Sequence, residues 1–95
     1  MKTRVVNIRK EGHDVYIGRG SKWGNPYKID DKIGMTREHV IELYRKWFMY
    51  TIKGKELQKD LYELEGKNIG CYCKPLACHG DILVELMDSL ENIKI

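Results

Sequence analysis

Two short clusters contain most of the residues whose types and spacing could do chemistry. The first is Gly18-Arg19-Gly20-Ser21-Lys22-Trp23-Gly24-Asn25-Pro26, a loop whose glycines let backbone N–H groups turn toward one anion. Its spacing matches neither a Walker loop nor a dinucleotide fingerprint. Trp23 either offers its ring to a base or sugar or fills the core, and we expect it to stack on the ligand. We expect this glycine-rich loop to bind a phosphate, to which the arginine can donate two hydrogen bonds. The residues expected to contact the phosphate are Gly18, Arg19, Gly20, Ser21, Lys22 and Asn25.

The second cluster is Cys71-Tyr72-Cys73-Lys74-Pro75-Leu76-Ala77-Cys78-His79-Gly80-Asp81. We expect the last helix to begin at Cys78. The free N–H groups and the positive dipole end of a helix favour an anion, which here is either a bound phosphate or a thiolate. We expect a ligand at this point to contact Lys74, Cys78, His79, Gly80 and Asp81, with His79 and Asp81 recognising its polar edges.

Two other chemistries also fit the second cluster. Cys78 is a candidate nucleophile, and Asp81 is the other candidate catalytic residue. His79 is a poor base for Cys78, because neighbouring side chains on a helix diverge by about 100°. Zinc could be bound by Cys71, Cys73, Cys78 and His79, but the C-x-C spacing and the adjacent last two ligands are unlike common structural zinc sites. We therefore expect no metal and no cofactor, and we expect Cys71 to be a small core residue.

The elements that must position these clusters follow from the apolar pattern. Short β-branched or apolar runs between turn residues predict strands over 3–8, 14–17 and 68–73. Apolar residues at helical spacing predict three helices. The first is capped by Thr36, runs for about 16 residues and is ended by Gly54, the second covers 55–64, and the third runs from 78 to about 90.

This order of elements predicts a small single-domain α/β sandwich over residues 1–95, with helices packed on a short sheet. We expect strand 68–73 to be central and to lie beside strand 3–8. Ligands of open α/β sheets bind beyond the carboxyl ends of the strands, and both clusters follow strands. The clusters should therefore converge on a single site.

Length and composition narrow the class of protein. The chain has 95 residues, of which 42% are hydrophobic and 33% charged, as expected of one globular domain. No apolar stretch approaches the roughly 20 residues of a membrane helix, and the N-terminus lacks a signal-peptide core. We therefore expect a cytoplasmic protein without a membrane partner. Three cysteines argue against a disulfide framework in that compartment.

The net charge of the chain is slightly positive, and the excess of basic residues is concentrated in the N-terminal third. The formal net charge is +3, and residues 1–30 contain seven basic and three acidic side chains. This bias suits a phosphate-bearing small molecule, but it falls short of the basic stripe of a protein that binds duplexes. A small nucleotide-like ligand is therefore the favoured partner, and nucleic acid is the less favoured one.

Five runs of the chain are similar to the motifs of a known family. They are Val5-Val6-Asn7-Ile8-Arg9, the run from Asp14 to Ser21, Trp23-Gly24-Asn25-Pro26, the run from Gly70 to Pro75, and Cys78-His79-Gly80-Asp81. Through them the chain resembles a family of small uncharacterised bacterial and phage proteins, defined as a domain of unknown function. The resemblance implies a compact α/β domain with a Rossmann-like sheet. It also implies a phage setting, in which small proteins can act on host nucleotide signalling.

Together these observations predict that the protein binds a phosphate-bearing nucleotide or nucleotide-derived molecule. We expect the site between the Trp-Gly-Asn-Pro loop and the N-terminus of the last helix. One alternative is a transferase or hydrolase that acts on the same class of ligand through Cys78 or Asp81. Another is a nucleic-acid-binding or zinc-stapled interaction module.

Overall fold

Three short parallel strands form the sheet of the computed structural model, which describes the backbone of residues 2–93 and the side chains of residues 2–89. Their bounds are β1 Arg4–Asn7, β2 Val15–Tyr16 and β3 Asn68–Cys71, in the spatial order β1-β3-β2. The residue Ile69 pairs with Val5 on one side and with Val15 on the other. The predicted central position of this strand beside β1 is therefore confirmed, although β3 ends two residues earlier than predicted.

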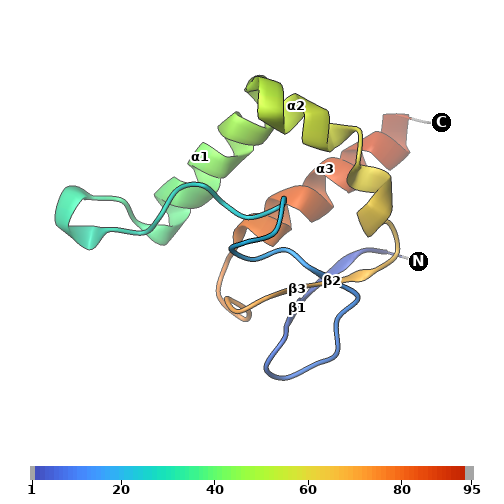
Figure 1. Cartoon of the computed structure of the whole chain (residues 1–95), viewed down its shortest axis with the longest axis horizontal. Helices are drawn as coiled ribbons and strands as arrows, with labels where there is room; N and C mark the ends of the chain where they lie inside the picture. The colour runs from blue at the N-terminus through green and yellow to red at the C-terminus, as the bar shows by residue number, and fades with distance from the viewer. Residues whose placement is uncertain (1, 94–95) are drawn as a thin grey trace.

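Three helices and two 3-10 turns complete the fold. The helices are α1 Arg37–Tyr50, α2 Ile52–Gln58 and α3 His79–Ile93, and the turns cover Asp31–Ile33 and Leu61–Leu64. Figure 1 shows all three helices on the same side of the sheet. The expected α/β class, with helices packed on a short sheet, is confirmed, and the structure adds that the strands are parallel. Within residues 2–93, no helix has the length and apolar character needed to cross a membrane.

The start of α1 follows the prediction, but its end does not. Thr36 caps the helix, since its Oγ1 accepts a hydrogen bond from the N–H of His39 at 3.2 Å. The helix ends at Tyr50, and Thr51 begins α2 by accepting the Gly54 N–H at 3.0 Å. Gly54 is buried inside α2, against the backbone of α1. The prediction that Gly54 ends the first helix is therefore wrong: glycine is required there because a side chain would collide with α1.

The second predicted helix, over 55–64, is divided into two pieces. The helix α2 stops at Gln58, and the chain resumes as the 3-10 turn Leu61–Leu64. Residues three apart in a 3-10 helix lie above one another. Both Leu61 and Leu64 are buried, so the tighter turn directs two leucines into one core instead of spreading them around an α-helix. The side chain of Leu90, at the predicted end of the last helix, lies outside the described residues.

The core fills the space between the sheet and the helices, and Trp23 is part of it. The Trp23 side chain is 2% exposed, and its ring lies 6.5 Å from that of Phe48 on α1. The hydroxyl of Tyr44 donates to the Trp23 carbonyl oxygen at 2.8 Å. The glycine-rich loop is thereby anchored to α1 at a buried point. This anchor decides which residues of the loop can face a ligand.

Candidate functional site

A cavity of about 410 Å³ lies beyond the carboxyl ends of β2 and β3. Its walls come from three parts of the chain: the end of β2 with the glycine-rich loop, the first turns of α1, and the segment from β3 into α3. The volume lies within the range of small-molecule sites. The two clusters expected to converge, represented by Arg19 and Cys78, thus line one cavity.

The glycine-rich loop contributes Gly18, Arg19 and Asn25 to the cavity wall. Arg19 is exposed, and within the described residues its side chain has no hydrogen bond or ion pair with the protein. Asn25 is engaged by the backbone: its amide donates to the Val40 carbonyl oxygen at 3.0 Å, and its carbonyl accepts the Tyr27 N–H at 2.9 Å. Arg19 is therefore available to a ligand, whereas Asn25 mainly holds the loop against α1.

Two residues expected to contact the ligand face elsewhere. The Nζ of Lys22 pairs with Asp60 at 3.1 Å and Glu63 at 2.9 Å, beside the 3-10 turn that follows α2. The hydrogen bonds that the Lys22 ammonium donates to Glu63 and Asp60 raise the pKa of Lys22. Trp23 lies in the core and does not line the cavity. The structure thus does not place Lys22 to bind phosphate, because its ammonium pairs with nearby carboxylates. It does not place Trp23 to stack on a ligand, because the indole is packed in the core.

Ser21 and Gly20 have local structural roles. The Ser21 hydroxyl donates to the Gly18 carbonyl oxygen at 2.7 Å, which closes the turn on itself. Gly20 has a φ of 91°, a left-handed conformation that favours glycine. Neither residue lines the cavity. These two residues shape the loop that presents Arg19 instead of contacting a ligand there.

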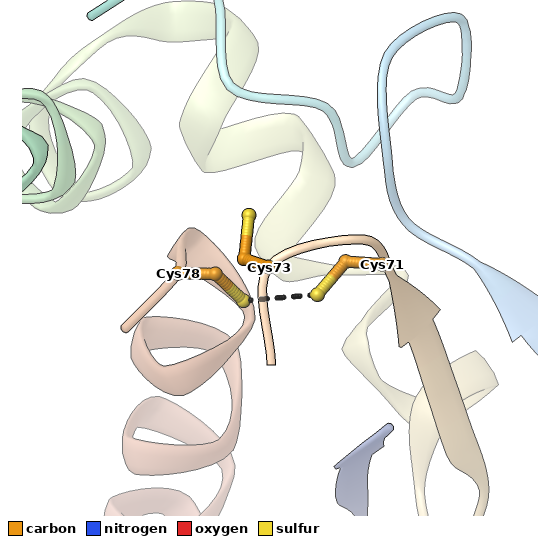
Figure 2. A group of neighbouring side chains, drawn as sticks. All are labelled: Cys71, Cys73 and Cys78. Atoms are coloured by element: carbon orange, nitrogen blue, oxygen red, sulfur yellow. Dashed lines mark hydrogen bonds between the residues drawn. The ribbon is translucent and has the colours of Figure 1, made fainter. Parts of the chain in front are cut away.

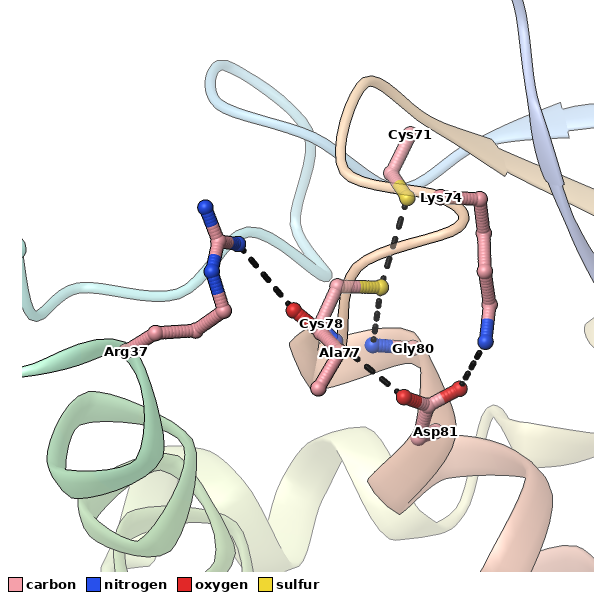
Figure 3. Close-up of polar contacts among 7 residues, drawn as sticks. All are labelled: Arg37, Cys71, Lys74, Ala77, Cys78, Gly80 and Asp81. Atoms are coloured by element: carbon pink, nitrogen blue, oxygen red, sulfur yellow. Dashed lines mark hydrogen bonds and ion pairs between the residues drawn. The ribbon is translucent and has the colours of Figure 1, made fainter.

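The start of α3 is closed by an unusual cap built around Cys78. The Cys78 Sγ accepts the Gly80 N–H at 3.2 Å, while the Asp81 carboxylate accepts the Cys78 N–H at 3.1 Å. The arrangement is similar to a capping box, but the capping atom is a sulfur and it accepts the N–H two residues along the chain. The other carboxylate oxygen of Asp81 binds the Lys74 Nζ at 2.8 Å (Figure 3). Lys74, Gly80 and Asp81 do not line the cavity, and their contacts hold the start of the helix.

His79 lines the cavity but does not face the thiols through its Nε2. That nitrogen lies 2.7 Å from the Ile17 carbonyl oxygen, to which it donates as Nε2–H. The ring packs edge-on against Tyr44, with centroids 5.1 Å apart. Burial lowers the pKa of His79, so the imidazole is neutral at pH 7. The expectation that His79 does not serve as the base of a Cys78 dyad agrees with this geometry.

All three cysteines line the cavity and lie close together (Figure 2). The Sγ atoms of Cys71 and Cys78 are 3.3 Å apart, and with Cys73 the three sulfurs lie within 4.8 Å of one another. The hydrogen bond from Cys78 lowers the pKa of Cys71 to about 5, while the same contact and burial raise the pKa of Cys78. The pair lies at the N-terminal end of α3, where the helix dipole favours a negative charge. Cys71 is buried as expected, yet it also forms part of the cavity wall.

Sequence reasoning missed several cavity residues. Arg37, the first residue of α1, lines the cavity and donates to the Ala77 carbonyl oxygen at 3.1 Å (Figure 3). No local pattern marks this contact, because it depends on the path of the loop before α1. Three tyrosines also line the cavity. They are Tyr16, Tyr27 and Tyr72. Only Tyr16 had a signal in the sequence: in an extended run successive side chains face opposite sides, so a buried Ile17 leaves Tyr16 on the other side.

Comparisons with known proteins support the resemblance found in the motifs. Residues 2–89 match the family model described as Domain of unknown function (DUF4326). The chain is 44% identical over 88 residues to the "Uncharacterized 12.4 kDa protein in nrdA-td intergenic region" of Enterobacteria phage T4, covering 92% of this chain and 79% of that protein. It is 35% identical over 97 residues to "Uncharacterized protein R718" of Acanthamoeba polyphaga mimivirus, covering 83% and 70% of the two chains. No solved structure matches it. The chain therefore belongs to the DUF4326 family, a family of small proteins with relatives in phages and other viruses.

Proposed function

We propose that this protein binds a phosphate-bearing nucleotide or nucleotide-derived small molecule in the cavity. One observation carries the proposal: Arg19 of the glycine-rich loop, Arg37 of α1 and His79 at the start of α3 line the same space. These residues come from segments that are far apart in the chain. The cavity offers positive charge and a surface for a ring within one enclosure.

The positive charge favours an anionic group. The guanidinium groups of Arg19 and Arg37 line the cavity, and the N-terminal end of α3 contributes its positive dipole at the same wall. Guanidinium groups bind phosphate oxygens through charge-assisted hydrogen bonds, often in pairs. The phosphate of the ligand is therefore expected at the exposed side of the cavity, where Arg19 lies.

The rest of the wall favours a flat, partly apolar group. Tyr16, Tyr27 and Tyr72 contribute aromatic surface, and Val40 and Ile41 contribute aliphatic surface. Tyrosine rings offer an apolar face together with a polar hydroxyl, which suits a base or a sugar. A nucleotide combines such a ring with a phosphate, whereas inorganic phosphate alone would leave this surface uncovered.

The test is a thermal-shift screen of the reduced protein against nucleoside monophosphates, cyclic nucleotides and ADP-ribose. The matched nucleosides and inorganic phosphate serve as controls. A ligand at 100 times its dissociation constant adds about 2.7 kcal/mol of stability. For a domain of this size that corresponds to a rise in Tm of about 10–20 °C. The proposal fails if no phosphate-bearing compound raises the Tm more than its nucleoside does.

Two arginine variants and one lysine variant locate the site. Arg19→Ala and Arg37→Ala are each expected to weaken the best nucleotide by about 10–100-fold, the value of a charge-assisted hydrogen bond. Lys22→Ala removes the same charge from a residue that pairs with carboxylates outside the cavity, so the affinity should stay unchanged. Equal losses in all three variants would indicate general charge attraction. The same comparison with single-stranded DNA tests the nucleic-acid alternative, which predicts a steep salt dependence.

A second candidate is a thiol-dependent transferase or hydrolase acting on the same class of ligand. The observation that favours it is the position of Cys71 and Cys78, whose side chains form part of the cavity wall. Incubation of the protein with the nucleotide identified in the screen, followed by chromatography, would reveal turnover. If turnover occurs, Cys78→Ser should abolish it while sparing binding, since serine retains the helix cap.

A further inference from the structure

We infer that Cys71, Cys73 and Cys78 form a binding site for a divalent, thiolate-seeking metal ion, with Zn²⁺ as its natural occupant. The three sulfur atoms lie within 4.8 Å of one another, and the closest pair is 3.3 Å apart. Thiolates around a tetrahedral zinc, bonded at about 2.3 Å, are about 3.8 Å apart. The observed separations span this value, so small side-chain movements are enough to bring all three sulfurs to one ion.

The three cysteines are positioned by different parts of the fold (Figure 2). Cys71 is the last residue of β3, Cys73 lies on the following loop, and Cys78 immediately precedes α3. The first and last are fixed by a sheet and a helix cap, and both are buried, while Cys73 is half-buried. The fold thus brings together three ligands that are spread over eight residues, and one side of the group remains accessible to an incoming ion.

The surroundings suit the charge of such a centre. Three thiolates around a divalent ion leave a centre with one negative charge, and any protons that the thiols still carry are released to solvent on binding. The Gly80 N–H already donates to the Cys78 sulfur at 3.2 Å, and the positive end of α3 lies beside it. Lys74, which is bound to Asp81, lies near both buried thiols. Hydrogen bonds and positive charge around thiolates stabilise metal centres of this kind.

The structure also removes one of the two objections raised by the sequence, which concerned His79 as a ligand adjacent to Cys78. Its Nε2 is bound to the Ile17 carbonyl oxygen, so the proposed centre does not use it. Three protein ligands leave a fourth position, which in zinc proteins is taken by water or by a ligand donor. Because all three cysteines line the cavity, that position faces the cavity. The metal site does not depend on nucleotide binding, and either proposal can fail without the other.

The experiment measures the metal directly. Protein produced with added zinc and purified in a thiol-free reductant without chelator is analysed for elemental content. The zinc-free protein is then titrated with Co²⁺. We expect one zinc per chain, and we expect the cobalt form to show near-ultraviolet sulfur-to-cobalt charge-transfer bands together with strong visible bands of tetrahedral cobalt. Reduced, folded protein that contains substoichiometric zinc and gives no charge-transfer band would overturn the proposal.

Three variants separate binding from folding. Cys73→Ser changes a half-buried residue, and Cys78→Ser keeps an oxygen that can cap α3, so both should remain folded by circular dichroism. Each is expected to lose cobalt affinity by at least about 100-fold, the upper end of what is seen when only an outer partner of a ligand is lost. His39→Gln is the matched control, because His39 is exposed and does not line the cavity, and it should bind as tightly as the wild type. The proposal is wrong if Cys73→Ser binds like the wild type, or if His39→Gln loses cobalt affinity as the cysteine variants do.

Discussion

Replacing Gly54 with alanine is expected to destabilise the protein, although alanine is the better helix former. Gly54 is buried in the first turn of α2, where this helix packs against the end of α1. A Cβ built at this position would overlap the carbonyl oxygens of Trp47 and Phe48 and would lie 2.6 Å from the Phe48 Cα. These are backbone atoms of α1, so they cannot rotate away as the end of a flexible side chain could. The two helices must separate to accept the methyl group.

The size of the effect follows from two opposing contributions. Alanine is favoured over glycine inside a helix by about 1 kcal/mol. Overpacking typically costs about 1–3 kcal/mol, and contacts with rigid backbone belong at the upper end of that range. The net loss in the free energy of unfolding is therefore about 2 kcal/mol. For a domain of this size the loss corresponds to a fall in Tm of about 8–16 °C.

Urea denaturation followed by circular dichroism measures this change, with thermal unfolding as a second readout. The control is Gly12→Ala, because Gly12 is exposed and an added Cβ there meets nothing within 4 Å. This control should remain within about 0.5 kcal/mol of the wild type. If Gly54→Ala is as stable as the wild type, or more stable, helix propensity governs the site and the close packing of α2 on α1 is refuted.

Two further predictions concern the buried anchor of the glycine-rich loop. Tyr44→Phe removes the hydroxyl that donates to the Trp23 carbonyl oxygen, so the free energy of unfolding measured in urea should fall by about 1–2 kcal/mol. The control Tyr62→Phe, at an exposed tyrosine, should change this free energy little. Equal effects of the two substitutions would contradict the buried hydrogen bond. Trp23→Ala should cost about 3–5 kcal/mol, as expected for a core aromatic side chain; a loss below about 1 kcal/mol would mean that Trp23 is not a core residue.

Local signals in the sequence were sufficient for the class of fold and for several boundaries. The β-branched run around Val5 and Val6 predicts a strand from residues that are adjacent in the chain. Thr36 predicts the start of α1 because an N-cap requires only its own hydroxyl and the N–H three residues later. The central place of β3 follows from its continuous apolar character, which suits a strand with neighbours on both sides. Each of these inferences depends on interactions within a few residues.

Other features depend on how distant segments meet. Because glycine disfavours helices, Gly54 predicts the end of the first helix. In the fold, Gly54 instead lies where α2 contacts the backbone of α1. The position of Lys22 in a glycine-rich loop predicts a phosphate ligand. In the fold, however, the turn after α2 places Asp60 and Glu63 beside Lys22, and these carboxylates pair with it. Trp23 could serve a ligand or the core equally well by composition, and only its contact with Phe48 decides for the core.

The candidate site shows the same division. The sequence alone shows that each of the two clusters follows a predicted strand. Because the carboxyl ends of parallel strands lie at one edge of a sheet, Arg19 and Cys78 could be expected to line one cavity. Only the tertiary structure decided that Arg37 joins them, that the Nε2 of His79 turns to the Ile17 carbonyl oxygen, and that three sulfurs meet. Side-chain direction depends on loop paths and on competing partners across the fold. Those quantities are not contained in the spacing of residues along the chain.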